Sequence, residues 1–253
     1  MAERFDLAIV GAGAAGLMAA IEAARARPGL SIVLLDGART LGAKILVAGG
    51  GRCNVTHHEV LPTDFAGGSR PAIGKVLREF PVGVTVTFFR DLGVELRREP
   101  TGKLFPATDQ ARTVLEALLR AAREAGVKLL YPRRVTAIRR AGAGFTLTGD
   151  WGEVAARRLI LAAGGQALPK SGSDGGGYAL ARALGRDVKR VHEDAAAMIE
   201  VGMVEKTEDG KLAVPFDEIR ADFVMKSAAP SLMAATASFT VPYPVTTMTT
   251  MSG

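Results

Sequence analysis

The sequence of 253 residues predicts an α/β fold, in which apolar strands alternate with helices. Three observations lead to this prediction. An apolar strand over residues 5–10 runs directly into a glycine-rich turn and then into an alanine-rich helix over 14–27. A second apolar strand over 31–35 ends on an acidic residue, Asp36. Downstream, strand-like and helix-like periodicities continue to alternate as far as residue 184.

The later elements follow from the same periodicities, and residues 37–56 are expected to form a glycine-rich loop. Helices are expected over 71–80, over 84–92 with Gly93 as the stop, from a cap at Thr108 or Asp109 to Gly126, and from the segment 171–177 to about 184. Strands are expected over 94–98, 102–106, 127–131, 134–140, 144–148 and 159–162, with a turn over 149–152. No internal repeat is present in the sequence.

The composition is that of a globular chain, with 48% hydrophobic and 23% charged residues. The net charge of +6 comes from 32 basic and 26 acidic residues, and the basic residues occur in short pairs rather than in a long run. A single cysteine excludes an intrachain disulfide. Neither a signal peptide nor a membrane-spanning run is apparent, so a cytoplasmic location is expected.

The turn after the first strand carries the first functional motif. Gly11, Gly13 and Gly16 have the G-x-G-x-x-G spacing of a dinucleotide-binding turn. Gly11 is expected to make the tight turn, Gly13 to let a pyrophosphate approach the backbone, and Gly16 to let the helix pack on the strand. The free amides at the helix start, at Ala14 and Ala15, favour the phosphate charge.

Asp36 stands where such sites place the acid that accepts hydrogen bonds from an adenosine ribose. An acid here argues against a 2′-phosphate, and hence against NADP, in this site. The alternative is a glycine-rich turn in an ordinary βαβ unit.

A second motif lies in the loop over 41–56. Three successive glycines over 49–51 let a planar ligand lie close to the backbone, Arg52 adds a positive charge, and Asn54 offers a donor and an acceptor. These features suit a flavin ring, whose N1/O2 edge gains negative charge on reduction. The alternative for this loop is a mobile surface linker.

The third motif is the strand over 159–162, which runs into Ala163 and two glycines, Gly164 and Gly165. Ligands of doubly wound sheets lie beyond the carboxyl ends of the strands, so small residues here permit close approach of a cofactor. The alternative is a plain strand-to-loop turn.

These motifs, with the segments 102–106 and 161–178, resemble the BaiN-type flavoproteins, a family of bacterial NAD(P)/FAD-dependent oxidoreductases. The resemblance covers about residues 5–190 and implies FAD bound in a three-layer ββα, Rossmann-like domain. It implies that Asp36 and the three fingerprint glycines hold the ADP half, and that the backbone of Val135 meets the adenine. The cofactor-binding residues it implies in the loop and at the sheet end are Lys44, Gly50, Gly51, Arg52, Cys53, Asn54, Ala163 and Gly164.

The chain departs from this family toward its C-terminus. The resemblance fades near His192, so residues 1–194 are expected to form the FAD-binding domain and 195–253 a divergent tail without a confident domain. Residues 227–253 contain no charged side chain. We therefore expect a fold that is incomplete at the C-terminus, through a frameshift, a rearrangement or a truncated gene, with a genuine divergent tail as the alternative.

The expected function is FAD-dependent transfer of a hydride from NAD(P)H to a small organic substrate, often an unsaturated carbonyl compound in this family. The alternatives are an FAD-binding remnant without catalysis and a flavoprotein that acts on tRNA. A nucleic-acid partner is not expected, because only 6% of residues are aromatic and no RNA-reading motif occurs. No metal is expected, since Cys53, His57 and His58 are too few ligands. The sequence leaves open the catalytic acid or base, the substrate, the choice between NADH and NADPH, and the oligomeric state.

Overall fold

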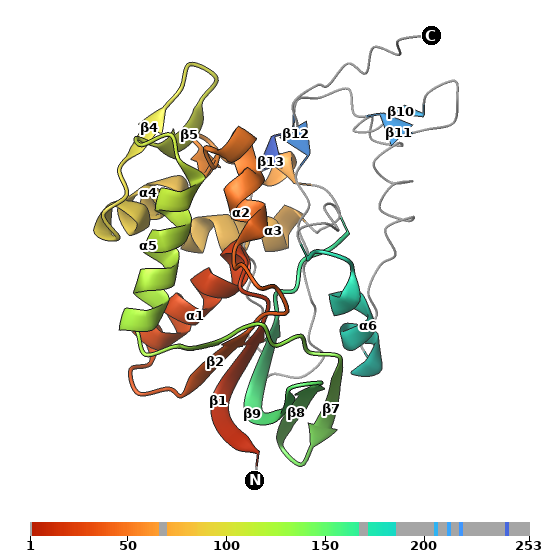
Figure 1. The fold of residues 1–253 in the computed structure, drawn as a ribbon. Helices are drawn as coiled ribbons and strands as arrows, with labels where there is room; N and C mark the ends of the chain where they lie inside the picture. Colours follow the sequence, from red (N-terminus) through yellow and green to blue (C-terminus); the bar gives the residue numbers. More distant parts are fainter. Residues whose placement is uncertain are drawn as a thin grey trace, which may run out of the picture.

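The computed structural model of the chain describes residues 2–65, 70–166 and 172–185, together with four two-residue strands between 205 and 242. Its centre is a six-stranded sheet in the order β6-β2-β1-β9-β8-β7 (Figure 1). These strands are β1 (Glu3–Val10), β2 (Ile32–Leu35), β6 (Lys128–Leu130), β7 (Ala137–Ala141), β8 (Gly144–Gly149) and β9 (Gly152–Leu161). The first four in the order are parallel, and β8 and β7 are antiparallel to their neighbours.

One face of the sheet is covered by two helices, α1 (Ala14–Ala26) and α5 (Ala111–Glu124) (Figure 1). Leu7 and Ile9 of β1 point to this face, where Leu17 of α1 and Leu118 of α5 are fully buried with them. Apolar residues at i, i+3, i+4 and i+7 of α5 supply the helical side of this core. The apolar periodicity that predicted both helices therefore corresponds to the face that each helix buries.

The other face of the sheet is covered by β structure. Alternate residues of β1, Ala8 and Val10, share a second core with Ile138 of β7 and Leu147 of β8. The antiparallel β7–β8 end of the sheet thus shares a core with the parallel strands, and α6 (Gly176–Ala183) adds Leu180 to it. The parallel strands with their covering helices confirm the predicted α/β, Rossmann-type fold class.

A smaller sheet in the order β3-β5-β4 extends from the helical side (Figure 1). Its strands are β3 (Thr56–His57), β4 (Leu96–Arg98) and β5 (Lys103–Pro106), and its helices are α3 (Arg70–Glu79) and α4 (Val82–Asp91), with a 3-10 turn η2 (Pro62–Asp64) before α3. The remaining strands pair as two short ladders, β10 (Glu205–Lys206) with β11 (Leu212–Ala213), and β12 (Glu218–Ile219) with β13 (Val241–Pro242).

Two local expectations were wrong. The expected loop over 37–56 contains a helix, α2 (Ala43–Val47), and a 3-10 turn, η1 (Ala48–Gly51), because Leu41 and Ile45 are drawn into the core beneath α5. Neither Thr108 nor Asp109 caps α5, whose N-cap is Gln110 without a side-chain hydrogen bond.

The predicted boundary at residue 194 and the predicted tail over 195–253 fall outside the described residues, apart from the four short strands, and stay predictions.

Candidate functional site

The glycine-rich turn after β1 has the geometry that the fingerprint predicts. Gly11 has a φ of +104°, and a Cβ built on it would lie 2.3 Å from the carbonyl oxygen of Ala162. A Cβ on Gly16 would lie 1.8 Å from the carbonyl oxygen of Gly11. Apart from its chain neighbours, no atom of the described residues lies within 4 Å of the corresponding position on Gly13, the N-cap of α1. Gly11 and Gly16 therefore serve packing, whereas Gly13 faces open space within the described part of the chain.

Asp36, directly after β2, is bound to this turn. Its Oδ2 accepts a hydrogen bond from the N–H of Ala12 at 2.6 Å, and its Oδ1 accepts one from the N–H of Ala38 at 2.8 Å. An ionised carboxylate has about four acceptor positions, so capacity remains for ribose hydroxyls. The bond to Ala12 was not predicted, and it ties the acid to the phosphate-binding turn.

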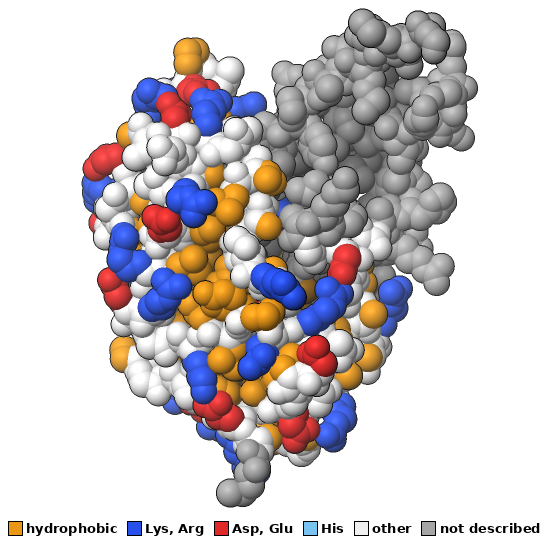
Figure 2. All heavy atoms as spheres, viewed as in Figure 1, with side chains coloured by type: hydrophobic (Ala, Val, Ile, Leu, Met, Phe, Trp, Pro, Cys, Tyr) orange, Lys and Arg blue, Asp and Glu red, His pale blue; other side chains and the backbone are white. Residues whose placement is uncertain are grey.

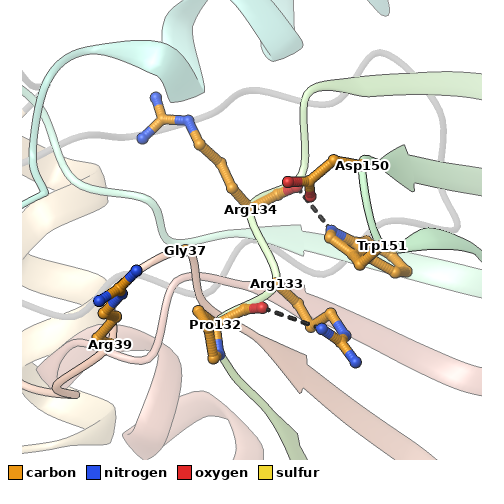
Figure 3. Close-up of a pocket in the computed structure, with 7 residues that line it drawn as sticks. All are labelled: Gly37, Arg39, Pro132, Arg133, Arg134, Asp150 and Trp151. Carbon is orange, nitrogen blue, oxygen red and sulfur yellow. Dashed lines mark hydrogen bonds between the residues drawn. The ribbon is translucent and has the colours of Figure 1, made fainter.

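A pocket of about 440 Å³ opens beside Asp36 (Figure 3). It is lined by Gly37, Arg39, Pro132, Arg133, Arg134, Asp150 and Trp151. The indole N–H of Trp151 donates to the carbonyl oxygen of Arg134 at 2.7 Å and fixes one wall. The Arg134 side chain points away from the pocket and pairs with Asp174, just before α6, at 2.6 Å. Sequence reasoning missed this pocket, although a tryptophan in a two-residue hairpin turn was a usable signal.

Val135 follows the pocket wall. Its side chain is buried in the second core, and neither its N–H nor its C=O takes part in a hydrogen bond between described residues. The backbone of Val135 thus keeps its hydrogen-bonding groups unused among the described residues, and its expected contact with an adenine stays a prediction.

The residues after β9 lie against the turn. Ala162 donates its N–H to the carbonyl oxygen of Val10 at 2.8 Å, so Ala163 lies close to Gly11. Gly164 has a φ of +76°, and a Cβ there would lie 2.5 Å from Oγ of Ser173. The sheet end, the turn and the approach to α6 therefore meet at one place. The intervening motif residues 167–171 lie outside the described residues.

The second glycine-rich segment is strongly left-handed. Gly49, Gly50 and Gly51 have φ values of 57°, 67° and 88°, and Cys53 follows with 64°. A Cβ on Gly49 would lie 2.7 Å from the Phe105 ring, whereas no described atom lies within 4 Å of the corresponding position on Gly50. Glycine is therefore required at 49 for packing against β5. The strand β13 also contacts this turn.

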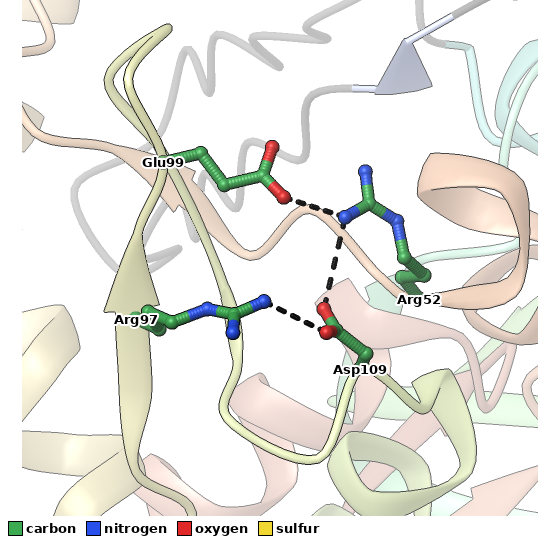
Figure 4. A network of polar contacts seen from close by, with 4 residues as sticks. All are labelled: Arg52, Arg97, Glu99 and Asp109. Carbon is green, nitrogen blue, oxygen red and sulfur yellow. Dashed lines mark hydrogen bonds and ion pairs between the residues drawn. The ribbon is translucent and has the colours of Figure 1, made fainter.

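Arg52 does not project from this loop as a free charge. Its Nη1 lies 2.5 Å from Glu99 and 3.7 Å from Asp109, which also pairs with Arg97 at 2.7 Å (Figure 4). Its guanidinium carbon lies 4.0 Å from the centre of the Phe105 ring. The structure thus uses Arg52 to attach the loop to β4 and β5, an arrangement that the sequence did not reveal.

Cys53 and Asn54 both point inward. Asn54 is only 1% exposed, and burial raises the pKa of the Cys53 thiol to about 12. Lys44, on α2, is half-buried, and burial lowers the pKa of its ammonium group. Of the loop residues expected to contact a cofactor, Lys44 and Gly50 are therefore better placed to reach one than Cys53 and Asn54.

His57 contacts the backbone: its Nδ1 lies 2.8 Å from the carbonyl oxygen of Glu59, and its Nε2 lies 3.0 Å from that of Thr101. Within the described residues, no three His, Cys, Asp or Glu side chains are grouped so as to hold a metal ion. A helix long and apolar enough to cross a membrane is likewise not found among those residues.

Comparison with known proteins connects this geometry to one family. The family model described as HI0933-like protein Rossmann domain matches residues 5–246. The chain is 38% identical over 185 residues to the 3-dehydro-bile acid delta(4,6)-reductase of Clostridium scindens, covering 73% of this chain and 45% of the relative. It is 30% identical over 186 residues to the ribosomal RNA dihydrouridine synthase of Escherichia coli, covering 74% of this chain and 46% of that one.

The chain therefore spans a little under half the length of these curated relatives. Among solved structures, the 3-ketosteroid-delta4-(5alpha)-dehydrogenase of Rhodococcus jostii RHA1 matches with a TM-score of 0.54 and 21% identity, over 73% of this chain and 55% of that one. This likeness shows a shared fold.

Proposed function

Since the chain belongs to the HI0933-like family of Rossmann flavoproteins, we propose that it binds FAD and acts in an oxidoreductase reaction. The observation that supports this most is the division of roles among the fingerprint glycines. Gly11 and Gly16 are explained by packing, but Gly13 faces open space and is explained by a ligand that approaches the backbone.

The described residues fit FAD along the length of the molecule. The amides at the start of α1 suit the pyrophosphate, and Asp36 retains acceptor positions for the ribose. The 440 Å³ pocket and the backbone of Val135 suit the adenine. Gly50, where no described atom would crowd a Cβ, supplies backbone for the flavin end. When bound, FAD supplies two-electron chemistry, and the residues of the chain orient the cofactor and exclude water.

The proposed electron donor is NAD(P)H, and the proposed substrate is a small unsaturated carbonyl compound. The names of the two curated relatives describe reduction of a 3-dehydro bile acid and formation of dihydrouridine. Both names fit addition of hydrogen to a carbon–carbon double bond activated by a carbonyl group.

A second candidate is modification of ribosomal RNA, favoured by the 30% identity to a dihydrouridine synthase and by the net charge of +6. The face in Figure 2 carries basic and acidic side chains intermixed, rather than the continuous basic surface that RNA binding uses. We therefore rank the small-molecule reaction first. A third candidate is FAD binding without catalysis, which the geometry of the glycine-rich turn would support by itself.

The test begins with the visible spectrum of the full chain after incubation with FAD and desalting, followed by anaerobic addition of NADH or NADPH. A retained flavin band that bleaches with one donor supports the oxidoreductase, and turnover is then compared between a cyclic enone and a uridine-containing ribosomal RNA fragment. A retained band that neither donor bleaches supports the binding-only candidate. Absence of a retained band from folded protein refutes the proposal.

A further inference from the structure

Arg134 joins two segments that lie far apart in the sequence. Its carbonyl oxygen accepts the indole N–H of Trp151 at 2.7 Å in the wall of the pocket. Its side chain points away from the pocket (Figure 3), and its Nη2 donates to Oδ2 of Asp174 at 2.6 Å. A Cβ built on Gly37 would lie 2.9 Å from Cβ of Arg134, so its backbone is also packed against the chain that follows β2. The backbone of Arg134 therefore belongs to the pocket, and its guanidinium belongs to another part of the site.

Asp174 extends this connection to the start of α6. Its Oδ2 accepts the hydrogen bond from Arg134, and its Oδ1 accepts one from the N–H of Gly176 at 3.0 Å. The Gly176 bond first, and then the Arg134 bond, hold the pKa of the Asp174 carboxyl below its usual range. A carboxylate at this place also suits the positive end of the α6 dipole. One ionised side chain thus links the pocket wall to the first turn of the helix.

The start of α6 lies on the residues that follow β9. The N–H of Gly175 donates to the carbonyl oxygen of Gly165 at 3.1 Å. A Cβ built on Gly177 would lie 3.1 Å from Cβ of Ala163, and one built on Gly11 would lie 2.9 Å from Cα of the same alanine. The beginning of α6 therefore contacts the segment that packs against the dinucleotide-binding turn.

The helix α6 is weak by its own sequence. It has eight residues, follows Gly175 at a φ of +81°, and begins with Gly176 and Gly177. Glycine disfavours the helical state, and a helix this short depends on its contacts with the rest of the chain. Those contacts include the buried side chain of Leu180. A polar bond at the start of α6 can therefore shift its equilibrium between folded and open forms measurably.

We propose that Arg134 is a positioning residue, which couples the folding of α6 to the occupation of the pocket by an adenine nucleotide. This role rests on the proposed binding of FAD, whose adenine suits the pocket, and it requires no contact between the Arg134 side chain and the cofactor. A ligand in the pocket restricts the backbone of its wall, so Arg134 meets Asp174 at a lower cost in entropy and α6 is stabilised. By linkage, the folded helix strengthens binding of the ligand by the same factor.

The experiment measures hydrogen–deuterium exchange of the α6 amides in the full chain, with and without saturating ADP. Arg134→Met removes the guanidinium and keeps the backbone carbonyl. Lys128→Met is the matched control, because Lys128 pairs with Glu3 on the far side of the sheet. That ion pair has the same 2.6 Å separation as the Arg134–Asp174 pair and is likewise partly exposed.

We expect ADP to slow exchange in α6 of the wild type about two- to fivefold, the range of an exposed ion pair. Lys128→Met should keep this response. In Arg134→Met the response should fall below about 1.5-fold, and the dissociation constant for ADP should rise by the factor that is lost.

A second measurement needs no ligand. Trp151→Phe removes the indole donor to the Arg134 carbonyl and keeps an aromatic ring in the pocket wall. In ligand-free protein this change should speed exchange in α6 about twofold. The same change in the Arg134→Met background should have no effect on α6, because the connection to Asp174 is already broken.

An ADP-saturated wild type with unchanged exchange in α6 would overturn the inference, as would an equal ADP response in Arg134→Met. A wild-type chain that binds neither FAD nor ADP counts against the proposed function instead. The ligand-free comparison then decides the role of Arg134, and equal effects of Trp151→Phe in the two backgrounds refute it.

Discussion

Replacement of the fingerprint glycines by alanine should separate folding from ligand binding. In Gly16→Ala, the new methyl carbon would lie 1.8 Å from the carbonyl oxygen of Gly11, a backbone atom that cannot move without shifting β1 or α1. Overpacking of this kind costs about 1–3 kcal/mol or more, and we expect the upper end. For a chain of this size, 1 kcal/mol corresponds to about 2–4 °C, so the melting temperature should fall by about 6–12 °C.

Gly13→Ala is the matched control, because it adds the same methyl group two residues after Gly11. No neighbouring atom of the described segments, apart from those of the adjacent residues, lies within 4 Å of that position, and the φ of −79° is accessible to alanine. The weaker N-cap preference of alanine is offset by about 0.4–1 kcal/mol from the less flexible unfolded chain. The melting temperature should therefore change by no more than about 2–4 °C.

The two variants are compared without ligand by circular dichroism and then titrated with FAD. Gly13→Ala should bind FAD at least about tenfold more weakly than wild type, since the methyl group occupies the space that a pyrophosphate needs. Equal melting temperatures for the two variants would refute the packing argument. Wild-type FAD affinity in Gly13→Ala would refute the role of the open space.

Three further predictions follow from polar groups of the site. Asp36→Ala should lower the free energy of unfolding in urea by about 2–3 kcal/mol, because it leaves the Ala12 N–H without its 2.6 Å acceptor. Asp36→Asn keeps an acceptor oxygen, so an equal loss of stability in the two variants would contradict this reasoning. Cys53 should resist iodoacetamide at pH 8 until urea unfolds the chain, since its folded pKa is about 12. Because that pKa is raised, the stabilisation from the neutral thiol is complete below about pH 9 and is lost as the pH rises toward 12, so the advantage over Cys53→Ala should shrink across that window. A double-mutant cycle on Arg52 and Glu99 should give a coupling of about 0.5–1 kcal/mol that falls in 0.5 M salt, because both side chains are partly exposed; a salt-independent coupling would argue against an ion pair.

The sequence predicted the main sheet and its helices because the spacing of their apolar residues matches the positions that are buried. The expected strand over 5–10 corresponds to β1, and the expected helix over 14–27 corresponds to α1 within a residue. Gly126, which was expected to end α5, follows the C-cap Ala125 and has a φ of +77°. In these segments local preference and tertiary packing point to the same structure.

The sequence did not predict features that depend on contacts between distant segments. The sequence predicts Arg52 to be a free charge. In the structure it pairs with Glu99, between β4 and β5, and with Asp109, just before α5. Asp109 reads as a helix cap, but its φ of +53° turns it toward Arg97. No local pattern contains this information.

The parallel pairing of β1 with β9 has a consequence for synthesis of the chain. Glu3 pairs with Val154, about 150 positions later, and Gly11 packs against residues that follow β9. At a translation rate of about 5–20 residues per second, one edge of β1 stays unpaired for roughly 8–30 s before its partner strand is synthesised. During that interval an apolar edge with unpaired backbone groups is exposed to other nascent strands. Chaperone demand and aggregation during expression should therefore depend on how quickly β9 emerges, more than on the stability of the finished sheet.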